Sequence, residues 1–146
     1  MTSEGDNRKK KQVLFICLGN SCRSIMAEAL ARHYYGEELE ASSAGLHPLG
    51  YIMDETLKVL TEIGVPVAGL YSKGLAEVPL QDMDLAVNLT RHQVSDALNP
   101  RFKGVMVHHP VVDPFGYDLE TYRLIRDQIK ELLSGAWSRL AKGSPT

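Results

Sequence analysis

Two cysteines and an arginine lie together near the start of the chain. Cys17 and Cys22 are the only cysteines of the sequence, and Arg23 follows directly. The segment Cys17-Leu-Gly-Asn-Ser-Cys-Arg23 comes after an apolar run that begins at Val13. A short loop between a strand and a helix can wrap its backbone N–H groups around a tetrahedral oxyanion, and the helix N-terminus adds positive potential. The segment therefore predicts an oxyanion site with a cysteine at its base.

The residue types within this loop suit anion binding. Gly19 permits a backbone conformation that a side chain would resist, and the short side chains of Asn20 and Ser21 can hydrogen-bond the loop into shape. The planar guanidinium of Arg23 can hold two oxygens of the anion at once. The expected phosphate-binding residues are Leu18, Gly19, Asn20, Ser21, Cys22 and Arg23.

Cys17 is the candidate nucleophile. At the base of an electropositive loop, its thiolate form is favoured at neutral pH, and Ser24 could stabilise that form by donating a hydrogen bond. The alternative for a lone cysteine in a strand is an inert buried thiol. The position of Cys17 within the loop favours a nucleophilic role over that of an inert buried thiol.

Strand-like and helix-like patterns alternate along the rest of the chain. The predicted strands are 13–17, 39–44, 84–89 and 104–108, and the predicted helices are 24–35, 53–63 and 125–140. Such alternation predicts a parallel, right-handed α/β sandwich. Ligands of these sheets bind at the carboxyl ends of the strands, which is where Cys17 lies.

Composition limits the other classes of function. A chain of 146 residues with 44% hydrophobic residues fits one domain, and a net charge of -2 gives no general basic field for nucleic acid or an anionic membrane.

Residues 1–11 are predicted to be a flexible basic tail and 12–146 a catalytic domain. The basic run before Val13 imitates a signal peptide, but the apolar run that follows is too short, and no segment reaches the roughly 18 apolar residues of a membrane span. Two cysteines do not make a disulfide scaffold, so we expect a cytoplasmic protein.

The loop from Cys17 to Ser24 resembles the active-site loop of the low-molecular-weight protein tyrosine phosphatase superfamily, which also contains the thioredoxin-coupled arsenate reductases. Three further stretches match in order: Arg23-Ser-Ile-Met-Ala-Glu28, Ser43-Ala-Gly45 and Asp113-Pro114. The resemblance spans roughly residues 12–141. It implies a flavodoxin-like three-layer sandwich with a four-stranded parallel sheet.

The resemblance also implies the catalytic roles: Cys17 is the nucleophile, Arg23 the phosphate clamp and Asp113 the general acid. Chemistry supports an acid, because the leaving oxygen needs a proton and the same carboxylate can later activate water. Other carboxylates compete on composition alone, namely Asp54, Asp82 and Asp84. The resemblance selects Asp113.

Supporting roles follow in the same way. Asn20 and Ser43 are implied to hold the loop conformation, and Ser24 to tune the thiolate. Cys22 could form a reversible disulfide with Cys17 and divert a sulfenic acid from irreversible oxidation. The alternative is that Cys22 only fills space at the start of the helix.

Aromatic residues near the acid bear on the substrate. Phe115 and Tyr117 could form a wall on which a phosphotyrosine ring stacks, and Tyr51 could form the opposite wall. The alternative is an ordinary mixture of core packing and exposed rings.

The histidines do not form a metal-ligand pattern. His108 and His109 would point in different directions on a strand, and no cysteine or carboxylate completes a ligand set at typical spacing. His33, His47 and His92 stand alone. We therefore expect no metal and no cofactor.

Two branches of the superfamily compete for the function. The reductases resolve the first adduct with cysteines well downstream, yet the sequence has none after Cys22, including the matching stretch 88–99. The stretches 20–28 and around Gly45 nevertheless favour the reductase branch. We predict a phosphatase that acts on a phosphorylated protein or a small phosphomonoester, with phosphate or arsenate as competing ligands. The alternatives are an arsenate reductase that uses an external thiol, and a non-catalytic phosphate-binding or phosphopeptide-binding module.

Overall fold

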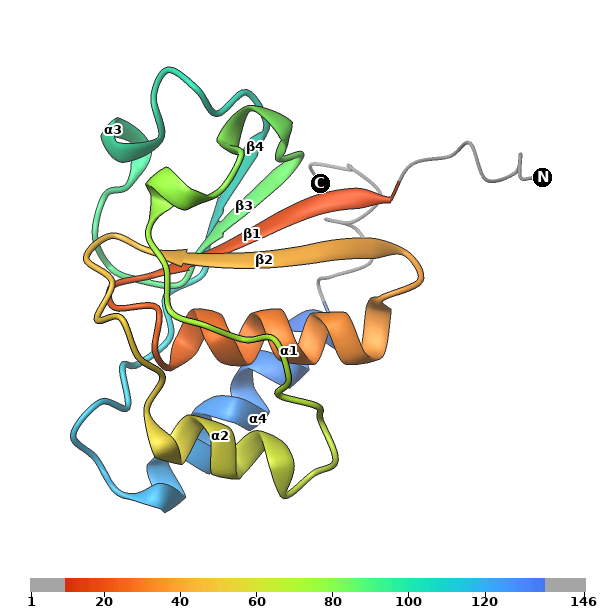
Figure 1. Ribbon diagram of the computed structural model, residues 1–146, viewed down its shortest axis with the longest axis vertical. Coiled ribbons are helices and arrows are strands. Elements are labelled where there is room, and N and C mark those ends of the chain that lie inside the picture. Colours follow the sequence, from red (N-terminus) through yellow and green to blue (C-terminus); the bar gives the residue numbers. More distant parts are fainter. Residues whose placement is uncertain (1–9, 136–146) are drawn as a thin grey trace.

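The computed structural model describes residues 10–135, and a parallel sheet forms its centre (Figure 1). The sheet has four strands in the order β2-β1-β3-β4, with every neighbouring pair parallel. The strands are β1 (Lys11–Cys17), β2 (Leu39–Gly45), β3 (Leu85–Asn88) and β4 (Val105–His108). This confirms the predicted single-domain α/β fold with a four-stranded parallel sheet. β1 includes Lys11, so the predicted tail 1–11 extends one residue too far; residues 1–9 lie outside the described part.

The longer helices lie on one side of the sheet. They are α1 (Arg23–Tyr35), α2 (Asp54–Thr61) and α4 (Leu119–Gly135) (Figure 1). The other side is covered by short elements that the sequence did not predict: the 3-10 helices η2 (Leu75–Glu77) and η3 (Leu80–Asp82), and the short helix α3 (Ser95–Leu98). The sheet is therefore the middle of three layers.

β1 contributes to a hydrophobic core on each face of the sheet. Val13 and Phe15 belong to the core beneath α1 and α4, whereas Leu14 and Ile16 belong to the core on the opposite face. All four side chains are completely buried. Alternate residues of a strand point to opposite faces, so a strand in the middle of such a sandwich must be apolar throughout.

α4 is amphipathic as predicted within the described residues. Ile125, Ile129 and Leu132 are buried in the core beneath α1. The last two positions of the predicted stripe, Ala136 and Leu140, lie outside the described residues. Within residues 10–135, no helix has both the length and the apolar character needed to cross a membrane.

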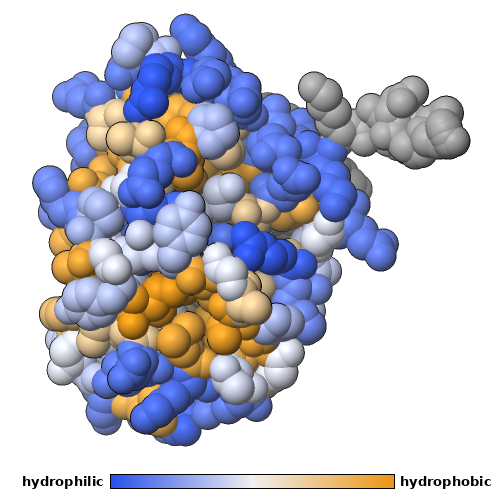
Figure 2. All heavy atoms as spheres, viewed as in Figure 1, coloured by the Kyte–Doolittle hydropathy of each residue, from blue (hydrophilic) through white to orange (hydrophobic). Residues whose placement is uncertain are grey.

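The segment after α2 crosses α1 on its way to the far face of the sheet (Figure 1). Ile63, Val67 and Leu70 of this segment pack partly buried against the core. Figure 2 shows hydrophobic side chains gathered over this region, with hydrophilic ones around it. The crossing brings the residues after Leu70 to the loop that follows β1.

Candidate active site

The loop between β1 and α1 has an unusual backbone conformation at Asn20. Its φ is 49°, a left-handed value that asparagine tolerates better than most residues. Its buried side chain holds the loop by donating from Nδ2 to Ser24 Oγ at 2.7 Å and to Ser43 Oγ at 3.0 Å. The Oδ1 atom accepts from the backbone N–H of Lys73 at 2.8 Å. The side chain of Asn20 therefore joins the loop to α1, β2 and the segment after α2.

Ser24 lies between this amide and the sulfur of Cys17. The Ser24 hydroxyl oxygen is 2.8 Å from Cys17 Sγ and accepts a hydrogen bond from Asn20. Because the amide supplies one hydrogen to that oxygen, the hydroxyl proton is available for the sulfur. This arrangement suits a thiolate at Cys17.

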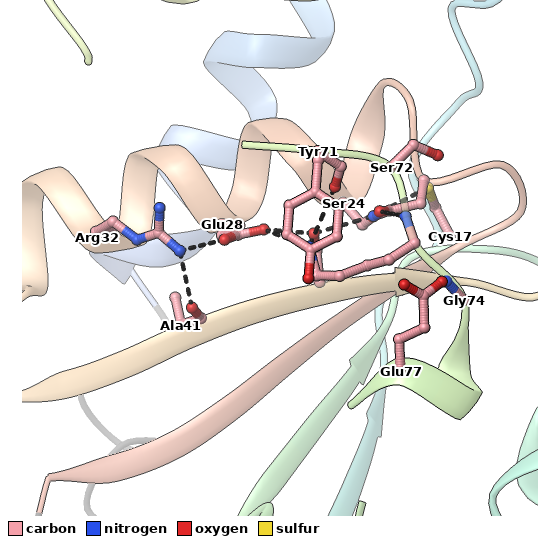
Figure 3. A network of polar contacts seen from close by, with 12 residues as sticks. Cys17, Ser24, Glu28, Arg32, Ala41, Tyr71, Ser72, Gly74 and Glu77 are labelled. Carbon is pink, nitrogen blue, oxygen red and sulfur yellow. Dashed lines mark hydrogen bonds and ion pairs between the residues drawn. The ribbon is translucent and has the colours of Figure 1, made fainter. Parts of the chain in front are cut away.

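A buried carboxylate continues the same chain of contacts. Ser43 Oγ donates to Glu28 Oε1 at 2.5 Å, and Glu28 also pairs with Arg32. Lys73 Nζ lies 3.6 Å from Glu28 Oε1 and 4.4 Å from the centre of the Tyr71 ring. Figure 3 shows the contacts extending from Arg32 along α1 to the loop. Glu28 and Lys73 were not predicted from the sequence, because the contacts that join them to each other and to Ser43 come from distant segments.

Arg23 leaves its Nε–H available for a ligand. Its Nη1 donates to Leu89 O at 3.3 Å and Val111 O at 3.1 Å, and its Nη2 lies 3.4 Å from Asp113 Oδ2. Its Nε is buried and has no hydrogen-bond partner among residues 10–135. A buried charged donor is costly when unpaired, so this atom fits an oxyanion bound in the loop.

Asp113 lies beside Arg23 with 43% of its side chain exposed. Its Oδ2 faces the guanidinium, and its Oδ1 accepts the backbone N–H of Phe115 at 3.0 Å. The ion pair and the turn fix the carboxylate at the entrance of the site. The carboxylate remains accessible to water.

One pocket of about 240 Å³ brings these groups together. It is lined by Cys17, Leu18, Gly19, Ser21, Cys22, Arg23, His47, Leu49, Asp113 and Phe115. The three predicted catalytic residues therefore share one cavity. Ser24, Asn20 and Ser43 do not line it and support the loop from behind.

The walls of the pocket differ from the prediction in part. Phe115 lines it, but Tyr51 and Tyr117 do not and are 56% and 62% exposed. The chain turns at Gly50, whose φ is 89°, before it reaches Tyr51. Tyr117 closes a turn through its N–H to Pro114 O at 2.8 Å. Their assignment as substrate walls stays a prediction, and in this structure both rings lie outside the pocket lining.

Leu49 and His47 also line the pocket, although the sequence did not predict them as wall residues. The backbone N–H of His47 donates to Leu18 O at 2.8 Å, and that of Leu49 donates to Gly19 O at 3.0 Å. These bonds hold the segment after β2 against the oxyanion loop. No local sequence signal shows this pairing.

Cys22 has a different environment from Cys17. Its Sγ donates to Tyr122 Oη at 3.6 Å, and burial raises the pKa of the Cys22 thiol. The pKa of Tyr122 is also raised, chiefly by burial and then by its hydrogen bond with Cys22. Both cysteines are free thiols, and burial favours the neutral form of Cys22.

The histidines occupy separate places. His108 Nδ1 lies 3.1 Å from Asn88 Nδ2, and the ring of His33 contacts that of Tyr34 edge-on. Within residues 10–135, no group of three or more His, Cys, Asp or Glu side chains could hold a metal ion.

A parallel α/β sheet with a cysteine and an oxyanion loop at the end of β1 defines an enzyme class that handles tetrahedral oxyanions. The chain belongs to the low molecular weight phosphotyrosine protein phosphatase family, whose model matches residues 12–145. The resemblance noted in the sequence is thereby confirmed.

Similar proteins come from both chemical branches. An arsenate reductase of Bacillus cereus (strain 03BB102) is 32% identical over 122 residues, covering 84% of this chain and 90% of the relative. A solved arsenate reductase in the phosphate binding state has a TM-score of 0.78 and 27% identity, covering 88% of this chain and 98% of its own. The YwlE arginine phosphatase from Geobacillus stearothermophilus has a TM-score of 0.76 and 26% identity, with 91% and 92% covered. Phosphatases and arsenate reductases thus share this scaffold.

Proposed function

We propose that the protein is a cysteine-dependent phosphatase that hydrolyses phosphotyrosine or related phosphomonoesters through a phosphocysteine. The observation that carries the proposal is the pocket shared by Cys17, Arg23 and Asp113, in which Nε of Arg23 is unpaired among the described residues. This reaction needs a nucleophile, a hydrogen-bond donor that binds the oxyanion, and a proton donor for the leaving group.

In the first half of the reaction, Cys17 Sγ attacks phosphorus as the thiolate. The P–O bond to the leaving group breaks, and Asp113 gives its proton to the departing oxygen. The loop N–H groups and Arg23 Nε stabilise the equatorial oxygens. The product is a phosphocysteine, and Asp113 is left as a carboxylate.

In the second half, water replaces the leaving group. Asp113 removes a proton from this water, whose oxygen attacks phosphorus while the S–P bond breaks. Phosphate leaves, the Cys17 thiolate is restored, and Asp113 is protonated again. Ser24 stabilises the thiolate at the beginning and the end of the cycle.

The walls of the pocket favour an aromatic phosphomonoester. Phe115 and Leu49 line it with apolar surface, and Phe115 is half exposed, so its ring is available to a substrate ring. We propose a phosphorylated protein or small aryl phosphate as substrate, with phosphate and arsenate as competing ligands. A catalytic thiol that must stay reduced favours a cytoplasmic setting.

Hydrolysis of p-nitrophenyl phosphate without added metal tests the proposal. We expect turnover by the wild type, none by Cys17→Ser, and about a hundredfold loss in Asp113→Ala, as general acid–base catalysis typically supplies. Asp96→Ala removes an exposed carboxylate outside the pocket and serves as the matched control. Arsenate should inhibit competitively.

This assay, together with phosphate binding and phosphoarginine hydrolysis, separates the alternatives. Turnover retained in Cys17→Ser would contradict the mechanism. Phosphate binding without turnover of any phosphomonoester would support a non-catalytic binding module. Hydrolysis of phosphoarginine in strong preference to phosphotyrosine would contradict the proposed substrate and place the chain beside its arginine phosphatase relatives.

Arsenate reduction is the second candidate, and the curated arsenate reductases at 32–33% identity favour it. Cys17 would attack arsenate and release water, after which an external thiol attacks the Cys17 sulfur. Arsenite then leaves with two electrons from the sulfurs, and a second external thiol reduces the mixed disulfide. Arsenite formation that depends on added thiol, without phosphatase turnover, would establish this reaction instead.

A further inference from the structure

A second pocket, of about 250 Å³, adjoins the first. The two pockets share Leu18, Arg23 and Asp113, which form their common boundary. The second is completed by Thr90, Arg91, His92, Val111 and Val112. The mechanism proposed above uses none of these five side chains.

The loop that follows β3 is held in a fixed conformation on this side of the site. Buried Asn88 accepts at Oδ1 from the Thr90 N–H at 2.9 Å and from its hydroxyl at 2.7 Å. Its Nδ2 donates to His92 O at 2.8 Å, and the His92 N–H donates to Thr90 Oγ1 at 2.9 Å. Arg91 therefore lies on a loop whose conformation is fixed by hydrogen bonds.

The charge of this second pocket is not balanced by its own carboxylate. Arg91 is exposed and forms no ion pair with any residue in the described range 10–135. Asp113 is already paired with Arg23 and with the Phe115 N–H. An incoming anion would thus meet the unpaired guanidinium of Arg91 beside a neutralised Asp113.

Part of the lining is apolar, because Leu18 and Val111 lie beside the exposed side chain of Val112, and the rest includes the polar residues Thr90 and His92. A group that combines methylene or aryl surface with a terminal negative charge would fit this mixture. A glutamate side chain has this chemistry, and so does an aryl group that carries a second phosphate.

We propose that the second pocket is a specificity subsite for an acidic group of the substrate, bound by Arg91 next to the phosphoryl group that Cys17 attacks. The inference rests on the proposed phosphatase function and extends it to the substrate class. The acidic group comes either from a residue that flanks phosphotyrosine or from a second phosphate of a small molecule.

Peptides that differ at one position test the subsite. We would measure kcat/KM for phosphotyrosine peptides with Glu or Gln directly before or after phosphotyrosine, and for an aryl bisphosphate beside the matching monophosphate. The wild type should prefer the acidic member of a pair by on the order of fivefold, as a partly exposed ion pair supplies. The preference should fall as salt is raised.

Variants then assign the preference to Arg91. Arg91→Gln should abolish it, and Arg91→Glu should turn it towards peptides with Lys at the same position. Arg101→Gln removes an exposed arginine outside both pockets and should keep the wild-type preference. Thermal unfolding of each variant checks that the fold is intact.

The outcomes separate this inference from the function on which it rests. A preference in the peptide pairs alone identifies a flanking acidic residue, and one in the bisphosphate pair alone identifies a second phosphate. Wild-type turnover with no acidic preference, or a preference that survives in Arg91→Gln, would overturn the subsite but keep the phosphatase. No turnover of any phosphomonoester would overturn both.

Discussion

At the scale of single residues, the hydroxyl of Ser24 links the Asn20 amide to the Cys17 sulfur. Asn20 donates to the Ser24 oxygen, and that hydroxyl lies 2.8 Å from Cys17 Sγ. A hydrogen bond to a charged group contributes about 1.5–3 kcal/mol. In the proposed mechanism, the serine would therefore stabilise the attacking thiolate through its own proton.

Ser24→Ala should lower the rate of phosphocysteine formation by roughly ten- to a hundredfold, because the thiolate loses this donor. Ser24→Thr keeps the hydroxyl and should restore most of the rate. Stopped-flow measurement of the p-nitrophenol burst checks both variants. An unchanged burst in Ser24→Ala would show that the hydroxyl does not act on the sulfur.

Cys22→Ser tests the proposed protective disulfide. Burial raises the pKa of Cys22, so peroxide should oxidise Cys17 first, and Cys22 should then close the disulfide. We expect wild-type activity to recover after peroxide and then dithiothreitol, and the variant to recover much less. Equal recovery of the two proteins would exclude the protective role.

At the scale of elements, the site depends on how closely β2 approaches the oxyanion loop. A Cβ added at Gly45 would lie 2.7 Å from Leu18 O and 2.9 Å from Asn20 N. Both atoms belong to the loop backbone, which cannot move without disturbing the anion site. The glycine at the end of β2 is therefore a steric requirement of the loop.

Gly45→Ala should lower the free energy of unfolding by about 1–3 kcal/mol, the usual cost of overpacking, and should weaken phosphate binding as well. Gly74→Ala adds the same methyl group to the bridge partner of Gly45, where it meets the Pro48 side chain at 3.1 Å. This control should affect phosphate binding less. Urea denaturation and phosphate titration measure the two effects, and equal losses of binding would contradict the steric account.

Local sequence predicted the part of the site that lies on contiguous elements. β1, its loop and the start of α1 follow one another directly, so Cys17 and Arg23 could be assigned from spacing. The wall at Leu49 depends on backbone bonds between segments far apart in sequence, and no periodicity reports them. Tyr51 and Tyr117 lie outside the pocket lining, and residue type alone does not show which side of a turn faces a pocket. The short helices η2, η3 and α3 were missed because they are too short for a helical period to appear.

At the scale of the whole molecule, an ion cluster joins α2 to α4 away from the site. Glu62 lies just after α2 and accepts hydrogen bonds from Arg123 and Arg126 of α4. The bonds from Arg123, and then those from Arg126, lower the pKa of Glu62 below its usual value of 4.5. Arg126 also donates to Val59 O at 2.9 Å, so it fixes the two helices together.

Glu62→Gln should lower the melting temperature at neutral pH. Because the folded state lowers the pKa of Glu62, its contribution is complete above the usual value of 4.5 and is lost as the pH falls through the folded-state pKa. The difference from wild type should therefore shrink in acid. Glu131→Gln removes the same charge from an exposed position of α4 outside the cluster. A difference that stays constant with pH, or that Glu131→Gln reproduces, would contradict this role.

In the whole molecule, the two adjoining pockets separate the proposed reaction site from the proposed specificity subsite. The pocket above Cys17 is built mainly from the loop after β1 and the segment after β2, whereas the pocket beside Arg91 is built from the segments after β3 and β4. Chemistry and substrate selection would then rest on opposite sides of the boundary formed by Arg23 and Asp113.

Detection of the covalent intermediate tests the phosphocysteine mechanism on Cys17 itself. Asp113→Ala should form phosphocysteine from p-nitrophenyl phosphate, whose leaving group needs little protonation, but should hydrolyse it slowly because the base for water is gone. Acid quenching followed by intact-mass and peptide mass spectrometry should find one phosphoryl group on Cys17, and none in Cys17→Ser. A phosphoryl group on another residue, or turnover without any phosphoenzyme, would contradict the account.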